Sequence, residues 1–141
     1  MRARFVYTRP DGGVSITCPS ANAVHYLMRG GRWPDAGLIW LAWQVARQVA
    51  NGVAIAVAAK WIHAMQHGGL TEREALWLIA ERDCRPYGTA IELWDVADIP
   101  ANRTHRDAWR RSQNGGPIWI DEDAAQRIDE DRLWRSYEAR T

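Results

Sequence analysis

The sequence predicts an α+β fold: a small antiparallel sheet, built from an N-terminal β-hairpin and two later strands, packed with three to five helices in a single domain, 1–141. Three observations predict this class. Two β-type runs flank a proline-glycine turn near the N-terminus, helical spacing of apolar residues covers the middle, and short β-type runs precede a capped helix at the end. The composition agrees, since 47% hydrophobic and 25% charged residues are ordinary values for a globular domain.

The first predicted element is the β-hairpin. Residues 4–8 and 14–18 are β-type runs, and the sequence Pro10-Asp11-Gly12-Gly13 lies between them. Proline presets the backbone angle that a turn needs, and glycine accepts a positive φ. We therefore expect the two runs to pair as antiparallel strands.

Helices are predicted through the middle of the chain. A short helix over residues 23–29 has a candidate cap at Ser20 or Asn22. The spacing of apolar residues over 35–50 predicts a core helix. Residues 53–59 alternate valine or isoleucine with alanine, which fits a buried strand or a second helix; the helix propensity of alanine favours the helix. The stripe expected to face the core from the 35–50 helix consists of Leu38, Leu41, Ala42, Val45 and Val49.

The last half contains the strongest helix-start signals. Thr71 and Glu74 have the spacing of a capping box, which predicts a helix over residues 72–83. Asp121 is placed to cap a final helix over residues 122–139. Two short strands are expected between these helices, at residues 89–96 and 118–120.

Composition and charge limit the classes of function. Two cysteines, Cys18 and Cys84, are too few for a disulfide scaffold and predict free thiols in a reducing cytoplasm. No targeting segment is expected, and Arg47 within the apolar stretch 38–65 favours protein core over a membrane span. We therefore expect a cytoplasmic protein with no membrane partner.

The formal net charge of +1 conceals blocks of opposite sign along the chain. Residues 1–60 carry a net +5 and residues 61–102 a net −4, while residues 103–120 carry +3 and residues 121–141 carry −3. Such blocks either pair with each other in the fold or offer charged surfaces to a partner.

No catalytic site, cofactor or metal is predicted. His63 and His67 would share one face of a helix, as metal ligands do, but no acidic residue lies between them. Cys84 lies at the C-terminal end of a predicted helix, where the helix dipole disfavours a thiolate. A metal-dependent hydrolase built on these three residues is therefore the least favoured function, and no small-molecule substrate is evident.

Candidate binding residues lie in two charged segments and among the nine tryptophans. Arginines of the segment 103–111 suit phosphate or an acidic protein surface, and Trp109 could stack; alternatively Trp109 packs in the core and the arginines pair with the acidic last helix. The acidic runs of that helix also allow a mimic of nucleic-acid charge directed at a nucleic-acid-binding partner. The predicted binding residues are Arg103, Arg106, Trp109, Arg110, Arg111, Trp94, Asp129, Glu130, Asp131 and Trp134.

One passage carries a family resemblance. The segment Asp98-Ile99-Pro100-Ala101-Asn102-Arg103-Thr104-His105-Arg106-Asp107-Ala108-Trp109-Arg110, then a glycine pair and Ile118-Trp119-Ile120-Asp121, resembles short proteins encoded in phage and prophage regions of proteobacteria. The opening Tyr7-Thr8-Arg9-Pro10-Asp11-Gly12-Gly13-Val14 is similar to their N-terminal hairpin. The chain departs from the pattern at His105, where an aromatic residue is usual, and through residues 33–69. The resemblance implies a mobile-element origin.

Together these features predict a phage or mobile-element protein that binds other proteins without catalysis. The expected partner is a host or phage protein complex in the host cytoplasm, including one that itself binds nucleic acid. Inhibition of a host defence system, as by an anti-CRISPR protein, is the leading hypothesis. The alternative is a virion or tail accessory or assembly protein.

Overall fold

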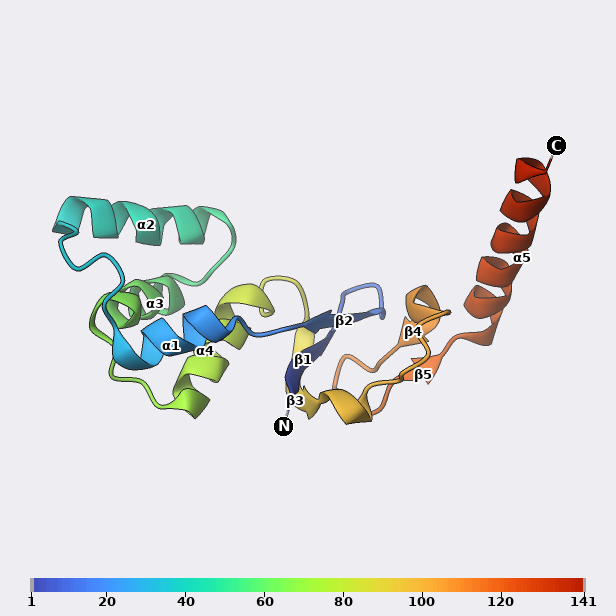
Figure 1. The fold of residues 1–141 in the computed structure, drawn as a ribbon, viewed down its shortest axis with the longest axis horizontal. Coiled ribbons are helices and arrows are strands. Elements are labelled where there is room, and N and C mark those ends of the chain that lie inside the picture. Colours follow the sequence, from blue (N-terminus) through green and yellow to red (C-terminus); the bar gives the residue numbers. More distant parts are fainter. Residues whose placement is uncertain (1, 141) are drawn as a thin grey trace.

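The computed structural model describes residues 2–140 and has an α+β fold. The described residues form five α-helices, a three-stranded antiparallel sheet and a separate two-stranded sheet. Figure 1 shows an elongated molecule, with helices α1 to α4 at one end, the larger sheet in the middle and α5 at the other end.

The larger sheet contains the predicted hairpin and one later strand. Strands β1 (Ala3–Thr8) and β2 (Val14–Thr17) pair antiparallel, and β3 (Thr89–Asp95) joins the other edge of β1 to give the order β2-β1-β3. The second later strand does not join this sheet as expected. Strand β5 (Trp119–Ile120) pairs instead with β4 (Trp109–Arg110), so the segment 103–120 folds back on itself.

The helices follow the local start and stop signals closely. Helices α1 (Ala21–Arg29), α4 (Glu72–Asp83) and α5 (Glu122–Ala139) are capped by Ser20, Thr71 and Asp121, and the capping box of α4 is formed in full. The helical alternative for the alanine-rich segment is confirmed, since α3 covers Ile55–His67. Helix α2 covers Leu38–Ala50. Two 3-10 turns, η1 (Val96–Asp98) and η2 (Arg106–Ala108), lie between β3 and β4.

The larger sheet is buried on both faces because the side chains of β1 alternate. Phe5 and Tyr7 pack with the helices, in a cluster that includes Leu27, Trp61 and Ile79. Val6, between them in sequence, faces the other way and belongs to a second cluster. This second cluster consists of Val6, Val14, Ile99 and Trp109. The sheet therefore joins the four-helix end of the molecule to the segment that carries α5.

Helix α2 does not form core as predicted. It begins at Leu38 rather than Asp35, because Ala36 closes a turn onto Trp33, which has a positive φ of 54°. Leu41 and Val45 contact the helical core, but no residue of α2 is buried. The rest of the predicted stripe faces solvent, because one side of α2 packs on α3 and no other element of the described chain covers the opposite side of α2.

Helices α1 and α3 approach most closely at their C-terminal glycines, Gly30 and Gly68. Both have positive φ, and a Cβ at either position would collide with backbone atoms of the other helix end. The N–H of Gly31 donates to the Gln66 carbonyl, and the N–H of Gly69 donates to that of Met28. Only glycine permits this crossing.

Replacing Gly68 by alanine therefore tests the packing of the helical end. We expect Gly68→Ala to lower the free energy of unfolding by about 3 kcal/mol or more, since backbone strain and a collision combine. Gly69→Ala is the matched control, because Gly69 has a positive φ but open space around it; its cost should stay near ~1 kcal/mol. Denaturant titration measures both, and equal losses would show that the crossing is not tight.

Candidate binding surfaces

Arg111 is a buried structural residue rather than the surface contact that the sequence predicted. Its Nε donates to the Gly116 carbonyl at 2.8 Å, and its Nη1 donates to the Ala90 carbonyl at 2.6 Å and the Thr8 hydroxyl at 3.3 Å. Its Nη2 forms an ion pair with Glu92. One guanidinium thus connects β1, β3 and the glycine loop, which explains why it lies inside.

Trp109 is also buried, with 1% of its surface exposed, so the expectation that it stacks on a partner is wrong. The core alternative holds for it, because the indole fills the cluster against Val6 and Val14. Trp94 is half-buried against the same cluster. Neither side chain is a free contact anchor.

The remaining basic residues divide into paired and exposed ones. Arg110 is half-buried and lies 3.7 Å from the Asp121 carboxylate, as the charge-pairing alternative predicts. Arg103 and Arg106 are exposed and form no ion pair among residues 2–140. These two are the arginines of the segment that remain available to a partner.

Among the contacts described for residues 2–140, those that attach helix α5 to the rest of the molecule lie near its base. Ala124, Ala125 and Ile128 pack on Ala108 of η2. Two further contacts tie the helix to the preceding loop: His105 and Asp129 are 2.8 Å apart, and Arg132 donates to the Thr104 carbonyl at 2.6 Å. Every side chain from residue 129 to 140 is exposed, and Figure 1 shows this part of the helix extending away from the rest of the molecule.

The exposed half of α5 carries an apolar stripe, formed by Leu133, Trp134 and Tyr137. These side chains are 71%, 62% and 61% exposed, and the two aromatic rings meet edge to face at 5.9 Å. The spacing of one and four residues places all three on one face of the helix, opposite the face that packs at the base. Glu130 lies on the same face, one turn earlier. The predicted residues Asp129, Glu130, Asp131 and Trp134 are therefore all exposed on this half-helix.

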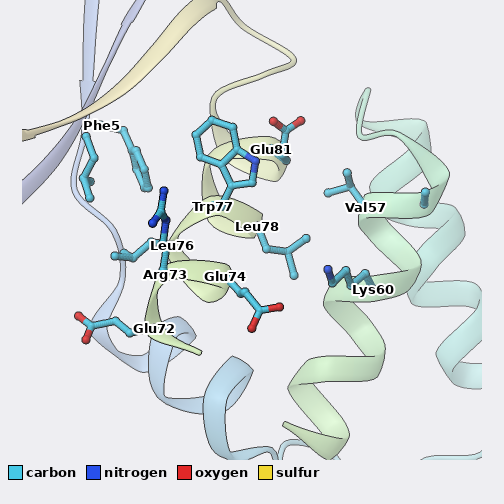
Figure 2. A pocket seen from close by; sticks show the side chains of 12 residues that line it. Phe5, Val57, Lys60, Glu72, Arg73, Glu74, Leu76, Trp77, Leu78 and Glu81 are labelled. Carbon is cyan, nitrogen blue, oxygen red and sulfur yellow. The ribbon is translucent and has the colours of Figure 1, made fainter. Parts of the chain in front are cut away.

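Sequence reasoning missed an apolar groove at the other end of the molecule. The groove has a volume of about 1080 Å³ and lies between α3, α4 and the edge of the sheet. Figure 2 shows Phe5, Val57, Leu76 and Trp77 around it, with charged side chains at its rim. Leu93 of β3, which is 40% exposed, also lines it. The sequence features that could have pointed to this groove were two large apolar residues, Trp77 on a predicted helix and Leu93 on a predicted strand.

The candidate catalytic groups do not assemble into a site. The rings of His63 and His67 lie 4.7 Å apart on α3, but among residues 2–140 no three His, Cys, Asp or Glu side chains are grouped to hold a metal. Cys84 is fully buried, and burial, with Asp83 beside it, raises the pKa of the thiol to about 11. A thiol with this pKa is protonated at neutral pH and is a poor nucleophile.

Comparison with known proteins finds no matching family model, no matching curated protein and no matching solved structure. The resemblance to phage proteins therefore stays a prediction. Within residues 2–140, no helix has both the length and the apolar character needed to cross a membrane.

The Arg111 contacts predict that this residue anchors the C-terminal segment to the sheet. Arg111→Ala leaves the Ala90 and Gly116 carbonyls without their donor, and we expect it to lower the unfolding free energy by about 2–4 kcal/mol. Arg106→Ala, at an exposed arginine of the same segment, should change it by less than ~0.5 kcal/mol. Denaturant titration compares the two variants, and similar values would contradict the anchoring role.

The two cysteines should differ sharply in reactivity. At about pH 8, a thiol reagent should modify exposed Cys18 within minutes, whereas buried Cys84 should react only after unfolding. In the Cys18→Ser variant, the folded protein should release no chromophore from Ellman's reagent until denaturant is added. Rapid reaction of this variant would mean that Cys84 is an accessible, activated thiol.

Proposed function

We propose that this chain is a phage or mobile-element protein that acts by binding another protein, without catalysis. The observation that carries the proposal is the apolar stripe of α5, three large side chains on a half-helix that no other element covers within residues 2–140. Isolated helical turns gain little stability from propensity alone, so a packing partner for this face would stabilise it.

The residue types on this face suit protein recognition. Tryptophan and tyrosine are enriched among the residues that contribute most to binding, because they offer large area and lose few rotamers. Acidic Asp129, Glu130 and Asp131 precede the stripe, while Arg103 and Arg106 project from the loop beside the base of α5. Charges around an apolar centre select partners and steer association.

Inhibition of a host defence complex is the leading form of the proposal. The resemblance of residues 98–110 to phage-encoded proteins supports a mobile-element origin. The acidic run Asp129, Glu130 and Asp131 of α5 would suit a basic partner surface, such as that of a nucleic-acid-binding complex. A virion or tail assembly role is the second candidate, and one observation favours it: uncovered apolar helix faces lie at both ends of the molecule, on α2 and on α5.

Affinity purification tests the binding proposal with matched variants. Tagged protein expressed in the phage host should recover a partner complex, and Trp134→Ala should reduce the recovered amount at least about tenfold. Glu130→Arg should reduce it by a smaller factor. Quantitative mass spectrometry measures the recovery.

Trp77→Ala is the control, since Trp77 is a similarly exposed tryptophan that lies in the groove, away from α5. Loss of the partner with Trp134→Ala but not with Trp77→Ala supports the proposal. Equal recovery by wild type and Trp134→Ala would contradict it. Detection of the protein in purified phage particles would favour the virion or tail assembly role over inhibition of a host defence complex.

A further inference from the structure

The outer face of α2, formed by Leu38, Ile39, Trp43 and Val49, is apolar although it faces solvent. Leu38, Ile39 and Trp43 are 85%, 89% and 60% exposed. The polar residues Gln44 and Gln48 lie on the sides turned toward the protein, and the Gln48 side-chain oxygen is buried without a hydrogen-bond partner. A surface helix usually has one apolar stripe, which faces the core, whereas α2 contacts the core through Leu41 and Val45 and is apolar on its outer side as well.

A basic side chain, Arg47, borders the outer face of α2, and Arg32 lies in the segment that leads into this helix. The Arg47 guanidinium lies 5.4 Å from the Trp43 ring centroid, and that of Arg32 lies 5.5 Å from the Trp33 ring centroid. Arg32 and Arg47 have no ion-pair partner among the described residues. Helix α2 contains no acidic residue, so its surface is apolar and positive.

The apolar stripe of α5 has the complementary character. It also presents large apolar side chains to solvent, but its face includes the acidic Glu130, while Asp131 pairs with Arg135 on the same helix. Across residues 121–141 the net charge is −3, and across residues 1–60 it is +5. Among the described residues Glu130 forms no ion pair, and neither does Arg47 of α2.

The two surfaces cannot meet within one molecule. Helices α2 and α5 lie at opposite ends of the long axis in Figure 1. The base of α5 is held by its alanine packing and by the His105–Asp129 and Arg132–Thr104 contacts, which keep the helix directed away from α2. A second copy of the chain can supply the missing partner for each.

We propose that the outer face of α2 in one copy binds the apolar stripe of α5 in the next, so that copies associate head to tail. The contact is heterologous, because it joins two different surfaces; such contacts build rings or filaments rather than closed pairs. The proposal rests on the proposed function, since it names a partner for the same α5 stripe. It gives the assembly candidate a physical basis.

The size of the contact sets the expected strength. Helix α2 has 13 residues, which at about 1.5 Å per residue matches the length of the exposed half of α5. One helix pair buries less than the roughly 800 Å² per partner of a standard interface. Association should therefore be reversible, appear above roughly 10 μM, and weaken with salt because exposed charges contribute to it.

Sedimentation velocity of the purified full chain tests the proposal, and two variants separate it from other forms of association. Ile39→Asp places a charge in the outer face of α2, and Leu133→Ala combined with Trp134→Ala removes most of the stripe of α5. All three positions are strongly exposed, so the folded monomer should be preserved, as circular dichroism and thermal unfolding will show. Trp77→Ala serves as the exposed-tryptophan control.

The expected result is that wild type and Trp77→Ala associate as concentration rises. The two blocked proteins, Ile39→Asp and the double variant Leu133→Ala with Trp134→Ala, should each stay monomeric alone. A mixture of the two blocked proteins should form a 1:1 dimer and nothing larger, because each retains one intact surface. Association of either blocked protein by itself, or no dimer in the mixture, would overturn the proposal. A wild type that stays monomeric but sediments with anionic vesicles through Ile39 would also overturn it, in favour of a lipid surface.

Discussion

The buried guanidinium of Arg111 is the interaction on which the rest of the structure depends. It donates hydrogen bonds to the carbonyls of Ala90 and Gly116 and forms an ion pair with Glu92. Strand β3 and the glycine loop are therefore both bound to the same guanidinium. Ala90 has a positive φ of 52° at the point where the β1–β3 register shifts, and its carbonyl is one of the two that accept from Arg111. A charge buried in this way is stabilised only while its partners are present. The segment that leads to α5 is therefore fixed to the sheet by a contact far from α5 itself.

The attachment of the C-terminal segment to the sheet also explains why the molecule has two ends with different surfaces. On one side of the sheet, four helices bury the larger core and leave the outer face of α2 uncovered. On the other side, Trp109 fills the smaller core and places η2 where the base of α5 can pack. Because the sheet is covered on both faces, neither end can fold over the other. Two uncovered helix faces thus remain at a distance, with opposite charge around them.

Much of the fold could be predicted because its signals are local. Caps at Ser20, Thr71 and Asp121, and glycines after the helices, act within a few residues, and the helix bounds followed them. The position of Arg111 could not be predicted, because its partners Ala90 and Glu92 are about twenty residues away. Apolar spacing also failed to show which face of α2 would be covered, since Leu38, Ile39 and Trp43 make nearly every side of that helix apolar. Of the predicted binding residues, the acidic ones and Trp134 lie exposed on α5, whereas Trp109 and Arg111 belong to the interior.

The central claim is that the uncovered faces of α2 and α5 are binding surfaces for each other in neighbouring copies. Amide hydrogen exchange of the wild-type chain at low and high protein concentration tests it most directly. The account predicts that peptides covering residues 38–50 and 129–139 gain protection together as concentration rises, while exchange in β3 stays constant. Protection that does not change with concentration, or that rises in only one of the two helices, would contradict it.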